Sequence, residues 1–198
     1  MPDETALRAT AEAFTVAEQY GHTAFNIARS ARGFTLVNRD GPEREAGFEL
    51  LAQVREMSAS RQYSLTMLPI VDAHIAKEKL RLGDCDAAIE LARPAVDELS
   101  ASGGAIWAPF AAAVLVEALV KRGGEADLEG ARTAIDRLAT QLTDRGLILQ
   151  EICLLRMRAL LAQALGEEVT YQNLRDSYRA MATSYGYEGH MKWAEAMP

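Results

Sequence analysis

The chain has 198 residues, of which 49% are hydrophobic, so it can bury the core of one domain, with or without a small second one. With 21 basic and 28 acidic residues its net charge is −7, which argues against a surface for nucleic acid or anionic membrane. The two cysteines, Cys85 and Cys153, are too few for a disulfide framework, and we expect small buried thiols in a reducing cytoplasm. The sequence begins with no signal-peptide pattern. Its longest apolar run, near Ala111–Val116, is interrupted by Glu117 well short of the ~20 residues of a membrane span.

Apolar residues recur at helical spacing along the first half of the chain, and no segment shows sustained strand alternation. We expect helices over residues 3–20, 22–39, 43–61, 65–82 and 84–100. Asp3 and Asp84 are expected to cap helices, and Pro42 suits a first helical residue. Pro94 predicts a kink or a lost backbone hydrogen bond inside the fifth helix. On the second helix we place Phe25, Ile27, Ala28, Ala31 and Phe34 on the apolar side, and on the third Ala46, Leu50, Leu51 and Val54.

The second half continues the pattern after a loop at Ser102, Gly103 and Gly104. Helices are expected over 106–122, 127–143, 147–165, 167–184 and 188–196. The sequence therefore predicts an all-α fold of about ten antiparallel helices.

Glycines end alternate helices at a nearly constant interval. They are Gly41, Gly83, Gly124 (or Gly123) and Gly166, which are 42, 41 and 42 residues apart. A small residue follows five places later at Ala46 and Ala88, and the step from Asp127 to Ala131 repeats the step from Asp84 to Ala88. A fixed period of helical hairpins is typical of an α-α superhelix in which each hairpin packs on its neighbours. The alternative is chance spacing of glycines between helices of similar length.

On this basis we predict one domain over residues 1–198. It comprises a partial repeat at 1–21, repeats at 22–62, 63–103, 104–145 and 146–186, and a capping helix at 187–198.

The central hairpin resembles the tetratricopeptide repeat through Gly83-Asp84, Ala88-Ile89 and Ala95. It departs from that family in its period, since the family repeats about every 34 residues. The aromatic residues of the family's first helix are replaced by Asp72 and Lys79. The resemblance implies a tetratricopeptide-like superhelix whose helices are each about one turn longer.

A second resemblance covers nearly the whole chain. The segments GFTLVNRDGPEREAGFELLAQVR, LPIVDAHIAKEKLRLGDCDAAIELARPAVDEL, AAAVLVEALVKRGGEADLEGARTAIDRLA and YQNLRDSYRAMATSYGYEGHMKWAEAMP resemble the C-terminal region of actinobacterial (mycobacterial) multidomain adenylate/guanylate cyclase–ATPase regulators. In that family the cyclase and nucleotide-binding domains precede the helical region. No G-x-x-x-x-G-K-[ST] phosphate loop occurs in these 198 residues. The resemblance therefore implies a terminal sensor or scaffold part without catalytic residues.

In a tetratricopeptide-like stack the first helix of each hairpin lines the concave groove. Carrying that register across gives the groove candidates Ala31, Thr35, Asn38 and Arg39; Ala73, Lys77, Leu80 and Arg81; Ala113, Glu117, Val120 and Lys121; and, less well aligned, Arg156 and Gln163. Arg39, Arg81 and Lys121 occupy one position, so a row of cations could hold an acidic peptide or a carboxylate. The alternative is that cations simply favour the last turn of a helix, by about 0.3–1 kcal/mol each.

The tail is rich in aromatic residues, with Tyr178, Tyr185, Tyr187 and Trp193. They are interpreted either as a cap over the apolar edge of the last repeat or as an aromatic recognition patch. At the other end, the first helix has no preceding partner, so its apolar side is a candidate edge for a homodimer.

No catalytic or metal-binding constellation is evident, and no cofactor is expected. His22, His74 and His190 lie in different repeats, and His74 with Glu78 suits a surface hydrogen bond or ion pair better than a metal or acid–base site. We expect a non-catalytic module that binds a protein, a peptide or a small ligand in its groove and regulates a cyclase/ATPase signalling protein. The rivals are a homo-oligomerisation scaffold, the sensor domain of a transcriptional regulator, and a small helical enzyme.

Overall fold

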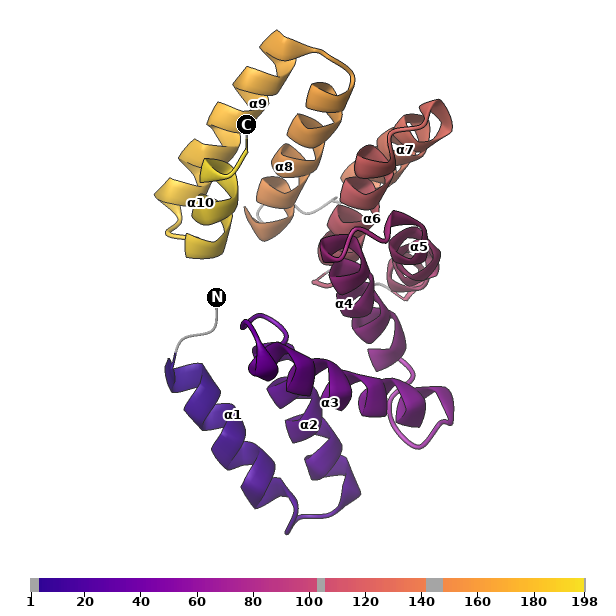
Figure 1. The fold of residues 1–198 in the computed structure, drawn as a ribbon, viewed down its shortest axis with the longest axis vertical. Coiled ribbons are helices and arrows are strands. Elements are labelled where there is room, and N and C mark those ends of the chain that lie inside the picture. The colour runs from indigo at the N-terminus through magenta and orange to yellow at the C-terminus, as the bar shows by residue number, and fades with distance from the viewer. Residues whose placement is uncertain (1–3, 103–105, 142–147, 198) are drawn as a thin grey trace. The chain divides into compact units, whose positions relative to one another are not determined.

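The computed structural model describes residues 4–102, 106–141 and 148–197. Within these ranges it contains ten α-helices and no strand, which confirms the all-α prediction. The helices are α1 (Glu4–Ala17), α2 (His22–Leu36), α3 (Pro42–Ala59), α4 (Met67–Arg81), α5 (Cys85–Ala101), α6 (Ala108–Arg122), α7 (Glu125–Gln141), α8 (Ile148–Ala164), α9 (Glu168–Ser184) and α10 (Glu188–Glu195) (Figure 1). The expected cap Asp3, the loop glycines 103–104 and the predicted ends at Thr143 and Leu147 lie outside the described residues.

The chain divides into two compact units. Unit 1 comprises residues 1–72 and unit 2 residues 73–198, so the division falls inside α4. Each unit has buried apolar residues of its own, among them Leu51 and Val54 in unit 1 and Ile152 and Met157 in unit 2. The single domain and the repeat boundaries expected from the glycine spacing stay predictions.

In unit 1, α2 packs against both α1 and α3 (Figure 1). The α2–α3 crossing is close because α2 carries Gly33 and α3 carries Gly47. A Cβ on Gly47 would lie 2.6 Å from the backbone nitrogen of Val37, and one on Gly33 would lie 2.8 Å from Cδ2 of the fully buried Leu51. Glycine at both positions lets the two helix backbones approach.

Two expectations for unit 1 were wrong. Ala46 is exposed and its neighbour Gly47 is buried, because α3 begins directly after Gly41 and its register therefore differs from that of α5. On α2, Ile27 is 57% exposed and Ala31 is also exposed. The buried face of α2 includes two polar residues, Asn26 and Ser30, so apolar periodicity alone misplaces it.

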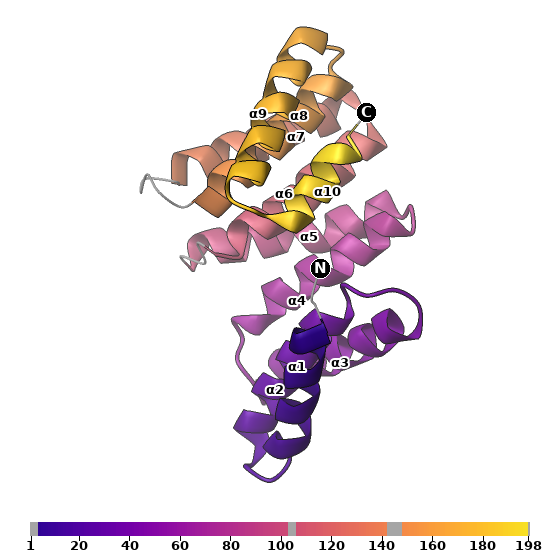
Figure 2. The ribbon, with the colours of Figure 1, turned by 90° about the vertical axis from the view of Figure 1, so that its left-hand side faces the viewer.

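In unit 2 successive helices pack as neighbours, and α6 is central to the arrangement. It contacts α5, α7 and α8, while α8 also contacts α7 and α9, and α9 contacts α10 (Figure 2). Much of α6 is alanine and valine, with Ala111, Val116 and Ala118 fully buried. Small side chains let three helices approach one helix at close distance. These neighbour contacts are the pattern expected of stacked hairpins.

The turn between α4 and α5 forms as the sequence indicates. Gly83 has φ +87°, a left-handed conformation that glycine adopts without strain. The Asp84 side chain accepts a hydrogen bond from the Ala87 amide at 3.1 Å, as an N-cap should. Pro94 lies on the exposed side of α5, so the hydrogen bond that it cannot donate is lost on the side that faces water.

Asp127 does not cap the start of its helix in the way that Asp84 caps α5. Helix α7 begins at Glu125, so Asp127 is its third residue, and its carboxylate accepts from the Gly124 amide at 3.2 Å. This is the reciprocal half of a capping box. Two hydrogen bonds from Arg122, at 2.5 and 2.9 Å, hold the same carboxylate and lower the pKa of Asp127. Asp127 therefore lies in the first turn of α7 and is not its N-cap, whereas Ala131, four residues on, is fully buried as Ala88 is.

Replacing Asp84 with alanine is expected to lower the free energy of unfolding by about 1 kcal/mol, because it removes the only side-chain cap of α5 recorded among the described residues. Glu90→Ala, on the exposed face of the same helix, is the matched control and should change it by less than about 0.5 kcal/mol. Urea denaturation of both variants measures the difference. Equal effects would contradict the capping role.

Candidate functional site

Two cations from different helices of unit 2 lie over the indole of Trp193 on α10. The Lys77 ammonium on α4 lies 5.4 Å from the ring centroid, and the Arg156 guanidinium carbon on α8 lies 5.2 Å from it. Glu117 on α6 forms an ion pair with Arg156 at 2.7 Å. We call these four residues, Lys77, Glu117, Arg156 and Trp193, the Trp193 cluster.

The three charged members of this cluster come from the first helices of successive hairpins. The tetratricopeptide register gave Lys77 and Glu117 as groove candidates and Arg156 as a less well aligned one, and in the structure Arg156 contacts Glu117 while Lys77 and Arg156 lie over the same ring. The side chain of Arg156 is only 15% exposed, and its Nε is buried without a hydrogen-bond partner among the described residues. A cation held in this way beside an aromatic face contributes more than a solvated one, because less water competes for it.

The tail supplies the rest of this surface. His190 on α10 lies 5.1 Å from the Trp193 ring, and its Nδ1 is 2.9 Å from the hydroxyl of Tyr178 on α9. Burial, with Arg156 nearby, lowers the pKa of His190 to about 4, so the imidazole is neutral at pH 7. Burial likewise raises the pKa of Tyr178 above its usual value. The pair is therefore an uncharged hydrogen bond that fastens α10 to α9.

Sequence reasoning did not foresee where Trp193 would lie. The tail aromatics were interpreted as a cap or a patch, and neither interpretation placed Trp193 between Lys77 and Arg156. Tyr178 is fully buried and Ala194 packs in the same core cluster, as a cap would, while Trp193 is 42% exposed and Tyr185 51% exposed. The contact joins helices far apart in the chain, and no local pattern indicates it.

Several predicted groove residues are unavailable to a ligand. Ala73 is fully buried and Leu80 is 5% exposed, since both face the core of unit 2. Ala113 and Val120 are half-buried, and Gln163 is exposed.

In unit 1 the candidates bond within the chain. The Thr35 hydroxyl donates to the Ala31 carbonyl at 2.8 Å, and the Asn38 amide donates to the Phe34 carbonyl at 2.8 Å. These are side-chain bonds to the preceding helical turn, which a ligand would have to replace.

The supposed row of cations is held by contacts within the protein. Arg39 pairs with Glu4 and Glu43, which raise its pKa, and Arg81 forms two hydrogen bonds to Glu78 at 2.6 and 2.8 Å. Lys121 donates to the Leu80 carbonyl, near the end of α4, at 3.3 Å. Arg81 and Lys121 do lie in the last turns of α4 and α6, where cations are favoured, whereas Arg39 lies beyond the end of α2.

His74 was expected in a surface interaction, and that expectation was wrong. Its side chain is 7% exposed and its ring lies 4.5 Å from that of Phe110 on α6. Burial first, and the charge of Lys77 second, lower the pKa of His74 to about 3. The imidazole is therefore neutral at pH 7 and packs as an aromatic side chain.

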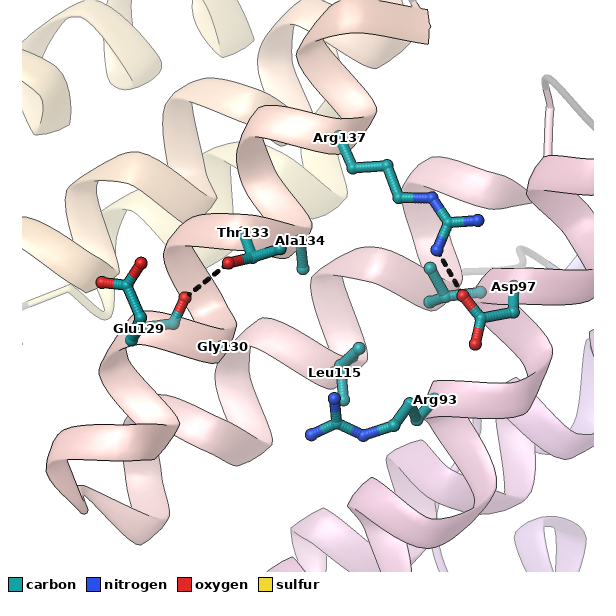
Figure 3. A pocket seen from close by; sticks show the side chains of 9 residues that line it. Arg93, Asp97, Leu115, Glu129, Gly130, Thr133, Ala134 and Arg137 are labelled. Carbon is teal, nitrogen blue, oxygen red and sulfur yellow. Dashed lines mark hydrogen bonds and ion pairs between the residues drawn. The ribbon is translucent and has the colours of Figure 1, made fainter.

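Unit 2 also has a hollow of about 350 Å³ between α5 and α7. Its floor includes Leu115 of α6, and an ion pair between Asp97 and Arg137 crosses one side (Figure 3). Arg93 and Glu129 lie on its rim, so its charges are mixed. The hollow lies on the second helices of the hairpins, whereas the groove was expected on the first helices.

Within residues 4–102, 106–141 and 148–197, no three His, Cys, Asp or Glu side chains are grouped to hold a metal ion. Cys85 and Cys153 are both free and half-buried, and burial raises the pKa of Cys153 to about 11, which makes its thiol a poor nucleophile. None of the described helices is long and apolar enough to cross a membrane.

Comparison of the chain with protein-family models, with curated proteins and with solved structures finds no match.

Proposed function

We propose that unit 2 is a non-catalytic interaction module that binds a polypeptide segment across α4, α6 and α8. The observation that supports it is the Trp193 cluster, in which Lys77 of α4 and Arg156 of α8 lie over one aromatic ring and Glu117 of α6 pairs with Arg156. Two cations and one carboxylate lie along successive hairpins. They can bind groups of opposite charge at different places on an elongated ligand and so set its orientation. Aromatic and arginine side chains are also the residues that most often dominate the energy of protein interfaces.

The wider role follows from the resemblance to the helical C-terminal regions of cyclase–ATPase regulators. We propose that a segment bound to unit 2 favours one state of a neighbouring signalling domain. Such a ligand shifts the population of states only by as much as it binds one state better than the other.

Selection of a random peptide library on the full chain tests the binding function. Peptides that bind should lose at least tenfold in affinity to a Lys77→Ala/Arg156→Ala double variant, because both cations of the Trp193 cluster are then absent. Arg93→Ala and Arg137→Ala, at the hollow between α5 and α7, are the matched controls and should leave the affinity unchanged. Fluorescence anisotropy gives the dissociation constants. Binders that tolerate the double variant would refute the proposal.

A further inference from the structure

The last helix differs from the other nine that the structure describes. α10 has 8 residues, whereas the others have between 14 and 18. A helix of this length is not stable alone in water, so its contacts with the rest of unit 2 hold it in place. Gly186, with φ +66°, joins it to α9.

One side of α10 is anchored by apolar packing. Ala194 is fully buried and Met197, just past the helix, is 8% exposed, and both belong to the core cluster that includes Ile152 and Tyr178. Met191 packs at the edge of the same cluster. Met191 and Ala194 are three residues apart on α10, which is a spacing found along one face of an amphipathic helix.

The other anchor of α10 is the indole of Trp193, which lies between two cations. Lys77 and Arg156 are 5.4 and 5.2 Å from its centroid, and Arg156 is in turn held by Glu117. The same surface that we propose for a partner is thus in contact with a segment of this chain. That segment is a short amphipathic helix with apolar residues on one face and an aromatic side chain beside them.

A tethered segment competes strongly with a free ligand. A short connection keeps α10 at an effective concentration in the millimolar range near its own surface. A partner that uses the same contacts can bind only the chains whose surface is uncovered, so its apparent affinity is its intrinsic affinity multiplied by the uncovered fraction.

We propose that α10 is an internal competitor, and that the partner of the α4–α6–α8 surface is an amphipathic helix that places an aromatic side chain between Lys77 and Arg156. This inference rests on the proposed function. The partner helix displaces α10 and takes over the cation–π contacts of Trp193. Such a helix uses the same mode of recognition as other helices that lie in a groove, with anchors on one face.

The probe is a fluorescein-labelled peptide of residues 185–198, added to the full chain and to its Trp193→Ala variant. The variant keeps Lys77 and Arg156 but loses the indole between them, so we expect it to bind the peptide at least tenfold more tightly than the original chain does. A peptide with alanine in place of its tryptophan should bind neither protein. Tyr185→Ala, which removes an exposed aromatic of the same tail, is the matched control and should not raise the affinity.

Displacement is observed directly by NMR of ¹³C-methyl methionine in the original chain, which does not require the variant to fold. A saturating amount of peptide should move the Met191 and Met197 signals towards those of solvent-exposed methionine. Equal affinity of the two chains, or unchanged signals at saturation, would overturn the inference. A dimer in light scattering that the peptide dissociates would overturn it as well, since the occupant would then be α10 of a second copy.

These experiments distinguish a failure of the proposed binding function from a failure of the proposed competition by α10. If library peptides bind through Lys77 and Arg156 with the same affinity in the original chain and in Trp193→Ala, the binding function stands and competition by α10 does not. If the library binders tolerate the Lys77→Ala/Arg156→Ala double variant, the binding function itself fails.

Discussion

Alanine at position 47 is expected to lower the free energy of unfolding of unit 1 by about 1–3 kcal/mol, a typical cost of overpacking a close contact. The added methyl group would lie 2.6 Å from the Val37 nitrogen and 2.9 Å from the Leu36 carbonyl carbon. Both are backbone atoms, which cannot rotate away as a side chain can. Helices α2 and α3 would have to separate, which would open the packing around Leu51 and Val54.

Gly130→Ala is the matched control for this substitution. Gly130 lies inside α7, and a Cβ there would lie 3.6 Å from Leu119 Cδ1, an ordinary contact. Alanine should stabilise that helix by about 0.5–1 kcal/mol, because it restricts the unfolded backbone. Hydrogen exchange in the full chain separates the two effects: Gly47→Ala should reduce protection in α2 and α3 only. Unchanged protection there would mean that the two helices do not cross as closely as described.

The buried imidazole of His74 should make the protein less stable in mild acid. Its pKa is about 3 in the folded protein against about 6.5 in the unfolded chain, so below pH 6.5 the unfolded state binds more protons. Stability therefore falls as the pH falls from 6.5 towards 3, and at pH 5 this one group lowers the free energy of unfolding by about 2 kcal/mol relative to pH 7.

Phenylalanine at position 74 keeps a ring against Phe110 but removes the titration. The free energy lost between pH 7 and pH 5 should be smaller in His74→Phe than in the original chain, by about 2 kcal/mol. His190, whose folded pKa is also lowered, contributes equally in both proteins and cancels in the comparison. Urea denaturation at the two pH values measures the difference. The same loss in both proteins would mean that His74 is not neutral and buried.

Local features of the fold could be predicted because they depend on neighbouring residues alone. Each of the ten described helices lies in or within two residues of its predicted range, since apolar spacing and glycine–aspartate turns act over a few residues. The Asp84 cap and the left-handed Gly83 are of this kind. The register of the third helix was not, because Ala46 and Gly47 differ in burial only through how α3 meets α2.

The candidate site, too, could be predicted from the sequence only in part. The repeat register included Lys77, Glu117 and, less well aligned, Arg156 among its groove candidates, because equivalent positions on stacked hairpins face one side. It also included Ala73, which is buried, and Arg39 and Arg81, which pair with neighbouring carboxylates.

The sequence by itself determined that the described part of this protein is built from helices, and it located each of them to within about two residues. Only the tertiary structure decided that Trp193 of α10 lies within reach of both Lys77 and Arg156. The physical reason is distance along the chain. Helix periods and caps are set by side chains a few residues apart, whereas the Trp193 contact joins positions 77, 156 and 193 and depends on how every helix between them packs.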